Sequence, residues 1–396
     1  RQMCIRDRMR VKLKDIFDLQ MGKTPSRSNL EYWNTTDYKW ISIADLTKTS
    51  KYIFETKEYL SKSAIKDSGI KVIPANTVVM SFKLSIGKTA ITKEDMYSNE
   101  AIMAFKDKHV INIIPEYIFY LFKYKNWEEC SNKAVMGKTL NKATLSEIEV
   151  EICSIEKQRQ IVNILDKIMS AVDGRKQELQ LLDELIKARF VEMFGDPVKN
   201  PKGWEVVTIG DIVTEVRYGT SKPAVEGGKY PYLRMNNLTA DGHLDLNDLK
   251  YIDIPDDEIE KCVVRKGDVL FNRTNSIELV GKTVVFDLQE DMIIAGYIIR
   301  VRLNKRLLPE ILSQYMNLEA LKDILRSMAK GAVNQANINA QELQSIKVYI
   351  PDMELQKQFI EMKNQVDKSK FDTMTFAPIY DIINLYLHTH FYQGRR

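Results

Sequence analysis

Two stretches of the chain mix short apolar runs with amphipathic segments. Runs rich in β-branched and aromatic residues at 38–43, 72–82 and 149–152 predict strands. An aromatic, amphipathic segment over 116–130 follows Pro115 and predicts a helix. The same plan returns over 204–350, with a helix expected at 309–328. Each stretch therefore predicts a mixed α/β (α+β) domain.

The intervening segment, 154–194, has a different pattern. It contains no proline and a single glycine, Gly174. Ser154 can cap its start, and Gly195-Asp196-Pro197 can end it. About 40 helical residues would span roughly 60 Å. Apolar residues recur at the spacing of one helical stripe at Ile161, Ile164, Leu165, Ile168, Val172, Leu179, Leu182, Leu185 and Ile186.

Such a long stripe needs something to cover it. A second helix is predicted after Pro351-Asp352, and its stripe is Leu355, Phe359, Met362 and Val366. The alternative is a helix buried within one large domain. The first interpretation is favoured, because no small domain could cover such a length.

The two α/β stretches are copies of each other. Ile86-Gly-Lys-Thr-Ala-Ile91 returns as Val280-Gly-Lys-Thr-Val-Val285, which places Gly87 and Gly281 194 residues apart (281 − 87). Trp40–Thr47 returns as Tyr232–Thr239, and Leu145–Ile152 as Leu343–Ile350. This period is far longer than a solenoid repeat of about 20–50 residues, so it implies two copies of a whole domain.

Composition limits the possible classes of protein further. With 396 residues and 44% hydrophobic content, the chain can bury more than one core. No apolar run approaches the roughly 20 residues of a membrane helix, and no secretory signal is visible, so a cytoplasmic location is expected. The four cysteines share no paired spacing that would indicate disulfides or zinc. The net charge of +4 permits a nucleic-acid partner.

The expected domain limits follow from the repeat. The first domain covers 11–153, the central spacer helix 154–200, the second domain 204–350 and the C-terminal spacer helix 351–370. Residues 1–10 are expected to be an irregular extension, with Met9 as the natural start. The tail 371–396 departs from the repeat, and a truncation or frameshift is expected after about Lys370.

Several motifs resemble catalytic sites but lack required parts. Gly-Lys-Thr occurs four times, without the earlier glycine that a phosphate-binding loop needs. Asp45 with Glu55 and Lys57 resembles a nuclease site but is not repeated in the second copy. His388 and His390 are too few for a metal site. No methyltransferase signature is visible, so no catalytic residue, metal or cofactor is assigned to this chain.

The two copies share an apolar frame and differ at polar positions within it. Arginine suits guanine and asparagine suits adenine in the major groove, whereas lysine suits phosphates. For any single residue, a drifting solvent-exposed face remains the alternative. The candidate base readers are Ser42, Asp45, Ser81, Arg234, Asn236, Asn237, Asn272, Arg273 and Asn275, and the candidate phosphate contacts are Lys83, Lys88, Lys138, Lys142 and Lys282.

Several motifs together carry a family resemblance: Gly22–Pro25, Tyr230–Met235, Lys266–Arg273, Glu156–Ile161 and Phe190–Pro197. In this order, with the duplication and the helical spacer, the chain resembles the specificity subunit of type I restriction–modification systems. The resemblance implies two target recognition domains, each a mixed twisted sheet with flanking helices, separated by long antiparallel coiled-coil helices. The expected packing residues of these helices are Ile161, Ile164, Ile168, Val172, Leu179, Leu182, Ile186, Phe359 and Met362.

The resemblance also implies partners. Double-stranded DNA would be read as a bipartite target, and the differing polar positions predict that this target is asymmetric. Modification subunits would use S-adenosylmethionine, and a restriction subunit would use ATP and magnesium. The alternative is a noncatalytic twin-domain scaffold that joins proteins through its coiled coil without DNA specificity.

Overall fold

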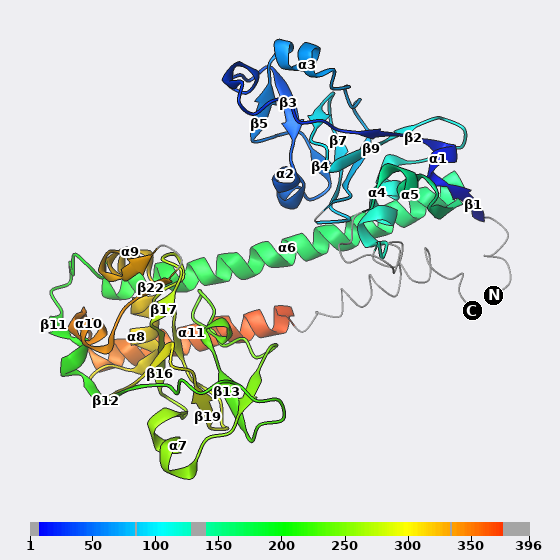
Figure 1. Ribbon diagram of the computed structural model, residues 1–396. Helices are drawn as coiled ribbons and strands as arrows, with labels where there is room; N and C mark the ends of the chain where they lie inside the picture. Colours follow the sequence, from blue (N-terminus) through cyan, green and yellow to red (C-terminus); the bar gives the residue numbers. More distant parts are fainter. Residues whose placement is uncertain (1–7, 84, 128–139, 333–334, 375–396) are drawn as a thin grey trace. The chain divides into compact units, whose positions relative to one another are not determined.

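The structure is a computed structural model that describes residues 8–83, 85–127, 140–332 and 335–374. The described chain divides into two compact units, with unit 1 ending at Gly174 and unit 2 starting at Arg175 (Figure 1). Each unit is mixed α/β, as the sequence predicted. Among the described helices, none is long and apolar enough to cross a membrane.

Unit 1 contains two sheets and a separate strand pair. The larger sheet has the order β2-β9-β6-β7-β4, in which only β4 and β7 pair in parallel. The smaller sheet has the order β5-β3-β8, and β1 pairs with β10. The strands are β1 Arg8–Lys12, β2 Phe17–Met21, β3 Tyr38–Ile41, β4 Tyr52–Ile53, β5 Glu58–Leu60, β6 Val78–Ser81, β7 Thr89–Thr92, β8 Tyr97–Ser98, β9 Ile102–Asp107 and β10 Glu149–Cys153. The helices are α1 Leu13–Ile16, η1 Leu30–Tyr32, α2 Ile43–Lys48, α3 Lys62–Ser68, α4 Pro115–Tyr124 and α5 Lys142–Ser146.

Unit 2 repeats this topology. Its first sheet has the order β12-β20-β16-β18, its second sheet β14-β13-β19-β15 and its third sheet β17-β22-β21, and β11 pairs with β23. The strands are β11 Glu205–Thr208, β12 Val213–Tyr218, β13 Tyr230–Leu233, β14 Lys250–Ile252, β15 Val263–Val264, β16 Val269–Asn272, β17 Thr274–Asn275, β18 Thr283–Val285, β19 Met292–Ile294, β20 Ile298–Leu303, β21 Lys330–Ala332, β22 Gln335–Asn337 and β23 Lys347–Ile350. The helices are η2 Ile209–Asp211, η3 Met235–Asn237, α7 Asp256–Cys262, α8 Pro309–Met316, α9 Glu319–Met328 and α10 Ala340–Ser345.

The repeat is therefore confirmed in three dimensions. β2, β9, β6 and β7 correspond to β12, β20, β16 and β18, while β5, β3 and β8 correspond to β14, β13 and β19. Even the parallel pairing of β3 with β8 returns between β13 and β19. Some elements differ: β4 has no counterpart in the sheets of the described part of unit 2, and the sheet β17-β22-β21 has none in the described part of unit 1.

The repeated Gly-Lys-Thr motif is a turn in both units. Gly87 and Gly281 have φ angles of 90° and 82°, which disfavour any side chain. Their amides donate to the carbonyls of Ser81 and Asn272, over 2.9 and 2.8 Å. A Cβ atom on Gly281 would lie 2.5 Å from Leu325. The glycines therefore serve the backbone.

The central spacer is one helix, α6, spanning Ile155–Phe194 (Figure 1). The Ser154 hydroxyl accepts the Lys157 amide at its start, and Gly195 ends it with a φ of 89°. Its early residues Ile161 and Leu165 are buried in the core of unit 1. Its late residues Ile186, Phe190 and Phe194 are buried in the core of unit 2.

The predicted stripe on α6 is only partly correct. Ile164 is 38% exposed, because at this turn Leu165 faces the core instead. Leu181 and Leu185 are exposed as well, so the alternative of a helix buried along its length is wrong. The remaining stripe residues are half-buried, namely Ile168, Val172, Leu179 and Leu182.

The helix α11, Met353–Met374, packs against the second half of α6. Phe359 contacts Phe190 and Phe194 edge to face, with ring centroids 5.2 and 5.6 Å apart. Lys370 forms an ion pair with Asp183. Position along α11 therefore decreases as position along α6 increases, which confirms an antiparallel pair in unit 2. Met362 also packs against this core.

Several predicted boundaries were wrong. Arg8, Met9 and Arg10 belong to β1, where they pair with Cys153, Ile152 and Glu151, so these three are not an irregular extension. The helix expected over 309–328 is two helices, α8 and α9, and the break at Asn317 turns its side chain onto Thr283. α11 continues through Phe371 to Met374, and the rest of the tail lies outside the described residues.

The close approach beside Gly219 generates a stability prediction. A Cβ atom there would lie 2.2 Å from the Ile294 carbonyl oxygen, so Gly219→Ala forces two strands apart and should destabilise unit 2 by about 3 kcal/mol. Gly174 lies within α6, and no atom beyond the neighbouring backbone of the helix itself lies within 4 Å of its Cβ position. Gly174→Ala should therefore raise the free energy of unfolding by about 1 kcal/mol. Thermal unfolding of both variants checks this, and equal melting temperatures would contradict it.

Candidate nucleic-acid interface

The turn after the central strand of the smaller sheet of unit 1 is closed by a capping box. Asp45 Oδ2 accepts hydrogen bonds from the amide and hydroxyl of Ser42, over 2.8 and 2.7 Å. Its Oδ1 accepts the Lys57 amide over 3.1 Å. Both carboxylate oxygens of Asp45 are therefore occupied, and the residue is 9% exposed.

Unit 2 builds the equivalent turn with an asparagine. Asn237 Oδ1 accepts the Arg234 amide over 2.8 Å, and its Nδ2 donates to the Asp245 carbonyl over 2.8 Å. Asn237 is 2% exposed. Each side chain therefore suits its second hydrogen-bond partner. Asp45 accepts from a backbone N–H in unit 1, whereas Asn237 donates to a backbone carbonyl in unit 2. In this conformation neither side chain can reach a base, which corrects their assignment as readers.

Two further candidates lie inside the protein. Ser81 and Asn272 end β6 and β16, and both are 0% exposed. The Ser81 hydroxyl donates to the Ser85 carbonyl. Asn272 Nδ2 donates to the carbonyls of Thr274 and Tyr297, each over 3.2 Å. Ser81 and Asn272 therefore each bind the loop that follows their strand. In this conformation they are structural residues, which corrects their assignment as base readers.

The lysines of the two repeated Gly-Lys-Thr turns both bind within the protein, and that of unit 2 points inward. Lys282 is 7% exposed, and its Nζ donates to the carbonyls of Met235, over 2.8 Å, and Leu238. Burial lowers the pKa of its ammonium. Lys88 is half-buried and donates to the Thr47 hydroxyl over 2.5 Å. Both lysines fasten the turn that follows β3 or β13, so Lys282 is wrong as a phosphate contact.

The remaining candidates reach the surface to different degrees. Asn236 and Lys142 are exposed, and Lys83 is half-buried above the Phe82 ring. Lys138 lies outside the described residues. Asn275 donates to the Asn272 side chain over 3.0 Å.

Arg234 is held by an acidic neighbour. Its Nη2 donates to the Asp248 carboxylate over 2.8 Å and to the carbonyl of the same residue over 3.0 Å. Hydrogen bonds from Lys250 and Arg234 lower the pKa of the Asp248 carboxyl. Arg234 would have to leave this exposed pair to reach a base.

Arg273 is half-buried and contacts a polar and an aromatic side chain. Its Nη2 donates to Asn337 Oδ1 over 3.0 Å, and its guanidinium carbon is 4.9 Å from the centroid of the Tyr218 ring. Its amide donates to the Tyr297 carbonyl. Tyr218 and Tyr297 are 44% and 51% exposed. We call Arg273, Asn337, Tyr218 and Tyr297 the arginine platform.

Unit 1 has other chemistry at the corresponding place. Phe82 corresponds to Arg273, because its amide donates to the Ala101 carbonyl as that of Arg273 donates to Tyr297. Phe82 is 1% exposed, whereas Met21, the counterpart of Tyr218, is 49% exposed. The same end of the same sheet therefore presents a different surface in each unit.

Tyr218 and Tyr297 were not predicted as site residues from the sequence. Their positions in the repeat could have indicated them. Tyr218 ends β12 and Tyr297 directly precedes β20, the strand that pairs with both β12 and β16. Asn337 was not predicted either, because its contact with Arg273 joins residues 64 positions apart.

One group of potential metal ligands occurs among the described residues, although none was expected. Asp183, Asp241 and His243 offer ligand atoms that lie within 4.8 Å of one another. Asp183 is already paired with Lys370, which supplies a positive charge there. The group therefore does not by itself indicate a metal site.

The family model for the type I restriction modification DNA specificity domain matches residues 6–184 and again residues 201–377. The chain belongs to this family. Each match takes in one α/β unit of the repeat together with helical residues that follow it, from α6 in the first match and from α11 in the second. The 194-residue period is thus one specificity domain.

Named relatives agree with this assignment. The chain is 30% identical over 250 residues to the type I restriction enzyme MjaIX specificity subunit of Methanocaldococcus jannaschii, covering 57% of each. It is 26% identical over 259 residues to the EcoKI specificity subunit of Escherichia coli K12, covering 61% of this chain and 56% of that subunit. The matched part of the chain therefore spans little more than half of these relatives.

Solved structures support the fold. A chain from a study of complex assembly and conformational transition of the type I R-M system aligns with a TM-score of 0.59 at 17% identity, covering 97% of both chains. The S subunit from M. genitalium aligns with a TM-score of 0.52 at 12% identity, covering 100% of this chain and 99% of that one. Both alignments cover nearly the whole of this chain, so its fold resembles that of both structures.

The inward position of Lys282 generates a prediction. Lys282→Ala removes the donor to two buried carbonyls and should destabilise unit 2 by about 2 kcal/mol. Lys142→Ala, at an exposed lysine, should change stability by less than about 0.5 kcal/mol. Denaturant unfolding measures both. Unchanged stability in Lys282→Ala would mean that its ammonium is free for phosphate.

A second buried lysine predicts a pH effect. Lys322 donates to the Gly281 carbonyl and to Asn317, and burial lowers its pKa to about 8. Between this value and the unfolded value of about 10.5, the unfolded state binds more protons, so stability rises with pH. The melting temperature of the wild type should therefore rise relative to Lys322→Met from pH 8 to pH 10. Parallel profiles would contradict this.

Proposed function

We propose that this chain is the DNA-recognition subunit of a type I restriction–modification complex. Units 1 and 2 each read one part of a bipartite, asymmetric target in double-stranded DNA. The arginine platform carries this proposal, because the Arg273 side chain contacts an asparagine and an exposed tyrosine, and the backbone of a second exposed tyrosine lies beside it. These side chains provide base-edge hydrogen bonds and stacking surfaces.

The geometry of Arg273 favours a reading role. Of the three guanidinium nitrogens of Arg273, only Nη2 has a hydrogen-bond partner among the described residues. Its Nε is buried without such a partner. Asn337 and the Tyr218 ring hold the guanidinium in place, which reduces the entropy lost on binding. An arginine held in this way can offer two N–H groups to guanine O6 and N7.

An asymmetric target follows from the comparison of the two units. They share strand order, turn glycines and a lysine that binds the turn after β3 or β13. At the position of Arg273, unit 1 has the buried Phe82. Its readers must therefore come from other positions, with Lys83 and Lys142 available as phosphate contacts.

In this proposal the chemistry belongs to partner subunits. Modification subunits that use S-adenosylmethionine, and a restriction subunit that uses ATP and magnesium, would assemble with this chain. The antiparallel pair of α6 and α11 supplies a rigid element for docking, and Leu181 and Leu185 are exposed apolar residues on α6. The length of α6 would set the gap in the target.

The arginine platform is tested by Arg273→Ala. Loss of the platform arginine should weaken binding to the cognate duplex by about 1–3 kcal/mol and relax specificity in one half of the target. Arg306→Ala is the control, because Arg306 is an exposed arginine beyond the opposite end of β20. Competition shift assays with duplexes substituted in each half measure both effects. Unchanged discrimination in the variant would remove Arg273 from the readers.

The scaffold alternative makes a different prediction. A twin-domain protein without DNA specificity should release a labelled duplex to any unlabelled competitor. The proposed function predicts that, at physiological salt, only competitor that contains the target displaces it.

A further inference from the structure

A buried glutamine sets the same register between two helices in each unit. Gln158 accepts the Ile114 amide over 2.9 Å, at the start of α4. Gln356 accepts the Leu308 amide over 2.9 Å, at the start of α8. Both glutamines are 0% exposed. Positions at equal distances from these contacts are therefore structural counterparts in the two units.

Two pairs of counterparts follow from this register. Glu116 and Glu310 each follow the first proline of their helix, α4 or α8. Asp166 and Asn364 each lie eight residues beyond the buried glutamine. What surrounds Glu116 and Asp166 in unit 1 can thus be compared with what surrounds Glu310 and Asn364 in unit 2.

In unit 1 the space beside these residues is filled by β4 and the residue before it. The Tyr52 hydroxyl donates to Glu116 over 2.6 Å. Lys51 forms an ion pair with Asp166 over 2.5 Å, and its ammonium lies 5.2 Å from the centroid of the Tyr120 ring. An extended Lys-Tyr pair therefore closes the space between α4 and α6.

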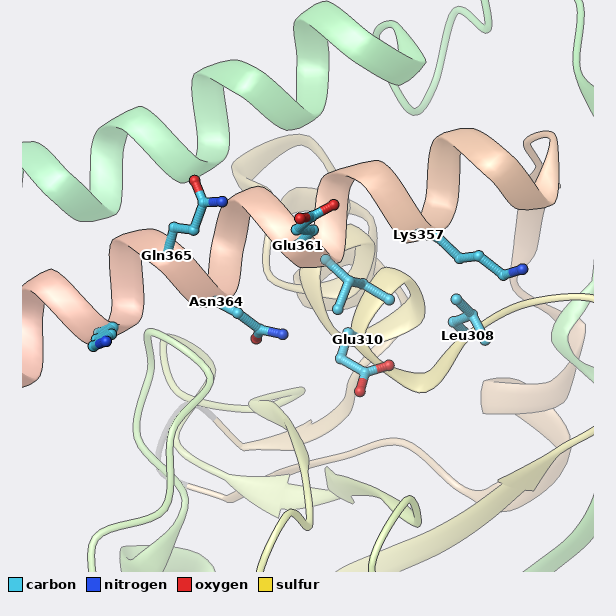
Figure 2. A pocket seen from close by; sticks show the side chains of 8 residues that line it. Leu308, Glu310, Lys357, Glu361, Asn364 and Gln365 are labelled. Atoms are coloured by element: carbon cyan, nitrogen blue, oxygen red, sulfur yellow. The ribbon is translucent and has the colours of Figure 1, made fainter.

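In unit 2 the same space is a groove of about 680 Å³. The side chains of Glu310, Glu361 and Asn364 border it, together with Leu308, Ile360 and Lys357 (Figure 2). Among the described residues, no group donates a hydrogen bond to the Glu310 carboxylate. The chain takes another course here, because Leu238 bridges to Leu244 and no strand corresponds to β4.

The neighbouring sheet edge is open at the corresponding place. The amide of Phe286 donates to β16 through the Asp268 carbonyl, so the Val285 amide faces away from β16. In unit 1 the corresponding amide, that of Ile91, donates to the Lys51 carbonyl over 2.9 Å. No described residue accepts from the Val285 amide. In unit 1, Lys51 and Tyr52 both fill the space beside α4 and pair with the edge of β7. The groove and the open edge of β18 in unit 2 therefore both correspond to the place that β4 occupies in unit 1.

We propose that this groove receives an extended segment of a protein partner that carries an aromatic hydroxyl and a basic residue. The segment lies parallel to β18, as β4 lies parallel to β7. Its hydroxyl donates to Glu310. Its basic side chain faces Glu361, which lies one helical turn before the position of the missing acid, Asn364.

The charges favour peptide over nucleic acid. Glu310 and Glu361 border the groove, and a phosphate beside them would be repelled. Lys357 and Lys368 are the first and last residues of α11 that line it, so they flank the acidic pair along the helix. The proposal does not depend on DNA recognition, which the shift assays test separately.

The chain itself supplies a probe for this groove. A fluorescein-labelled peptide that copies residues 49–55 contains the Lys-Tyr pair, and a second peptide has phenylalanine in place of the tyrosine. Fluorescence anisotropy with the full chain should give saturable binding of the first peptide. The phenylalanine peptide should bind roughly tenfold more weakly, because it loses a hydrogen bond to a charged acceptor.

Three variants locate the site. Glu310→Gln should bind the two peptides with nearly equal affinity, because it removes the charged acceptor. Glu354→Gln, at an exposed glutamate of α11 outside the groove, should keep the tenfold difference. Absence of saturable binding, or a difference that survives in Glu310→Gln, would overturn the proposal. So would loss of the difference in Glu116→Gln alone, since the peptide would then be displacing β4 in unit 1.

Discussion

One uninterrupted helix contributes buried side chains to two separate cores, and the rest of the molecule depends on that constraint. Ile161 and Leu165 of α6 pack in unit 1, while Phe190 and Phe194 pack in unit 2 against Phe359 of α11. A break within either buried stretch of this helix would expose apolar side chains of the core to which that stretch belongs. This explains why 154–194 contains no proline.

Around this helix one scaffold is used twice with different surfaces. Turn glycines, capping boxes, the lysines that bind the turn after β3 or β13, and the buried glutamines that set the helix register return in both units. The polar differences have two physical origins. Asp45 against Asn237 fits a changed backbone partner, whereas Phe82 against Arg273 changes what the sheet end presents to solvent. Only the second kind can change recognition.

Much of the fold was predictable from the sequence, because apolar spacing and the repeat report directly on packing. The helix ends at Ser154 and Gly195 followed from capping chemistry. The candidate site was harder. In the sequence, an asparagine that caps a turn, such as Asn237, cannot be told from one that reads adenine. The inward position of the Lys282 side chain depends on carbonyls 44 and 47 residues away. The groove beside Glu310 could not be predicted, because it arises where the described part of unit 2 has no strand corresponding to β4.

The central claim is that the two units read different sequences as parts of one target. Binding-site selection from a random duplex library, with the full chain and its modification subunits, tests this most directly. The account predicts two short enriched sequences that differ from each other, separated by a gap of constant length. A palindromic motif, a single enriched block or no enrichment would contradict it.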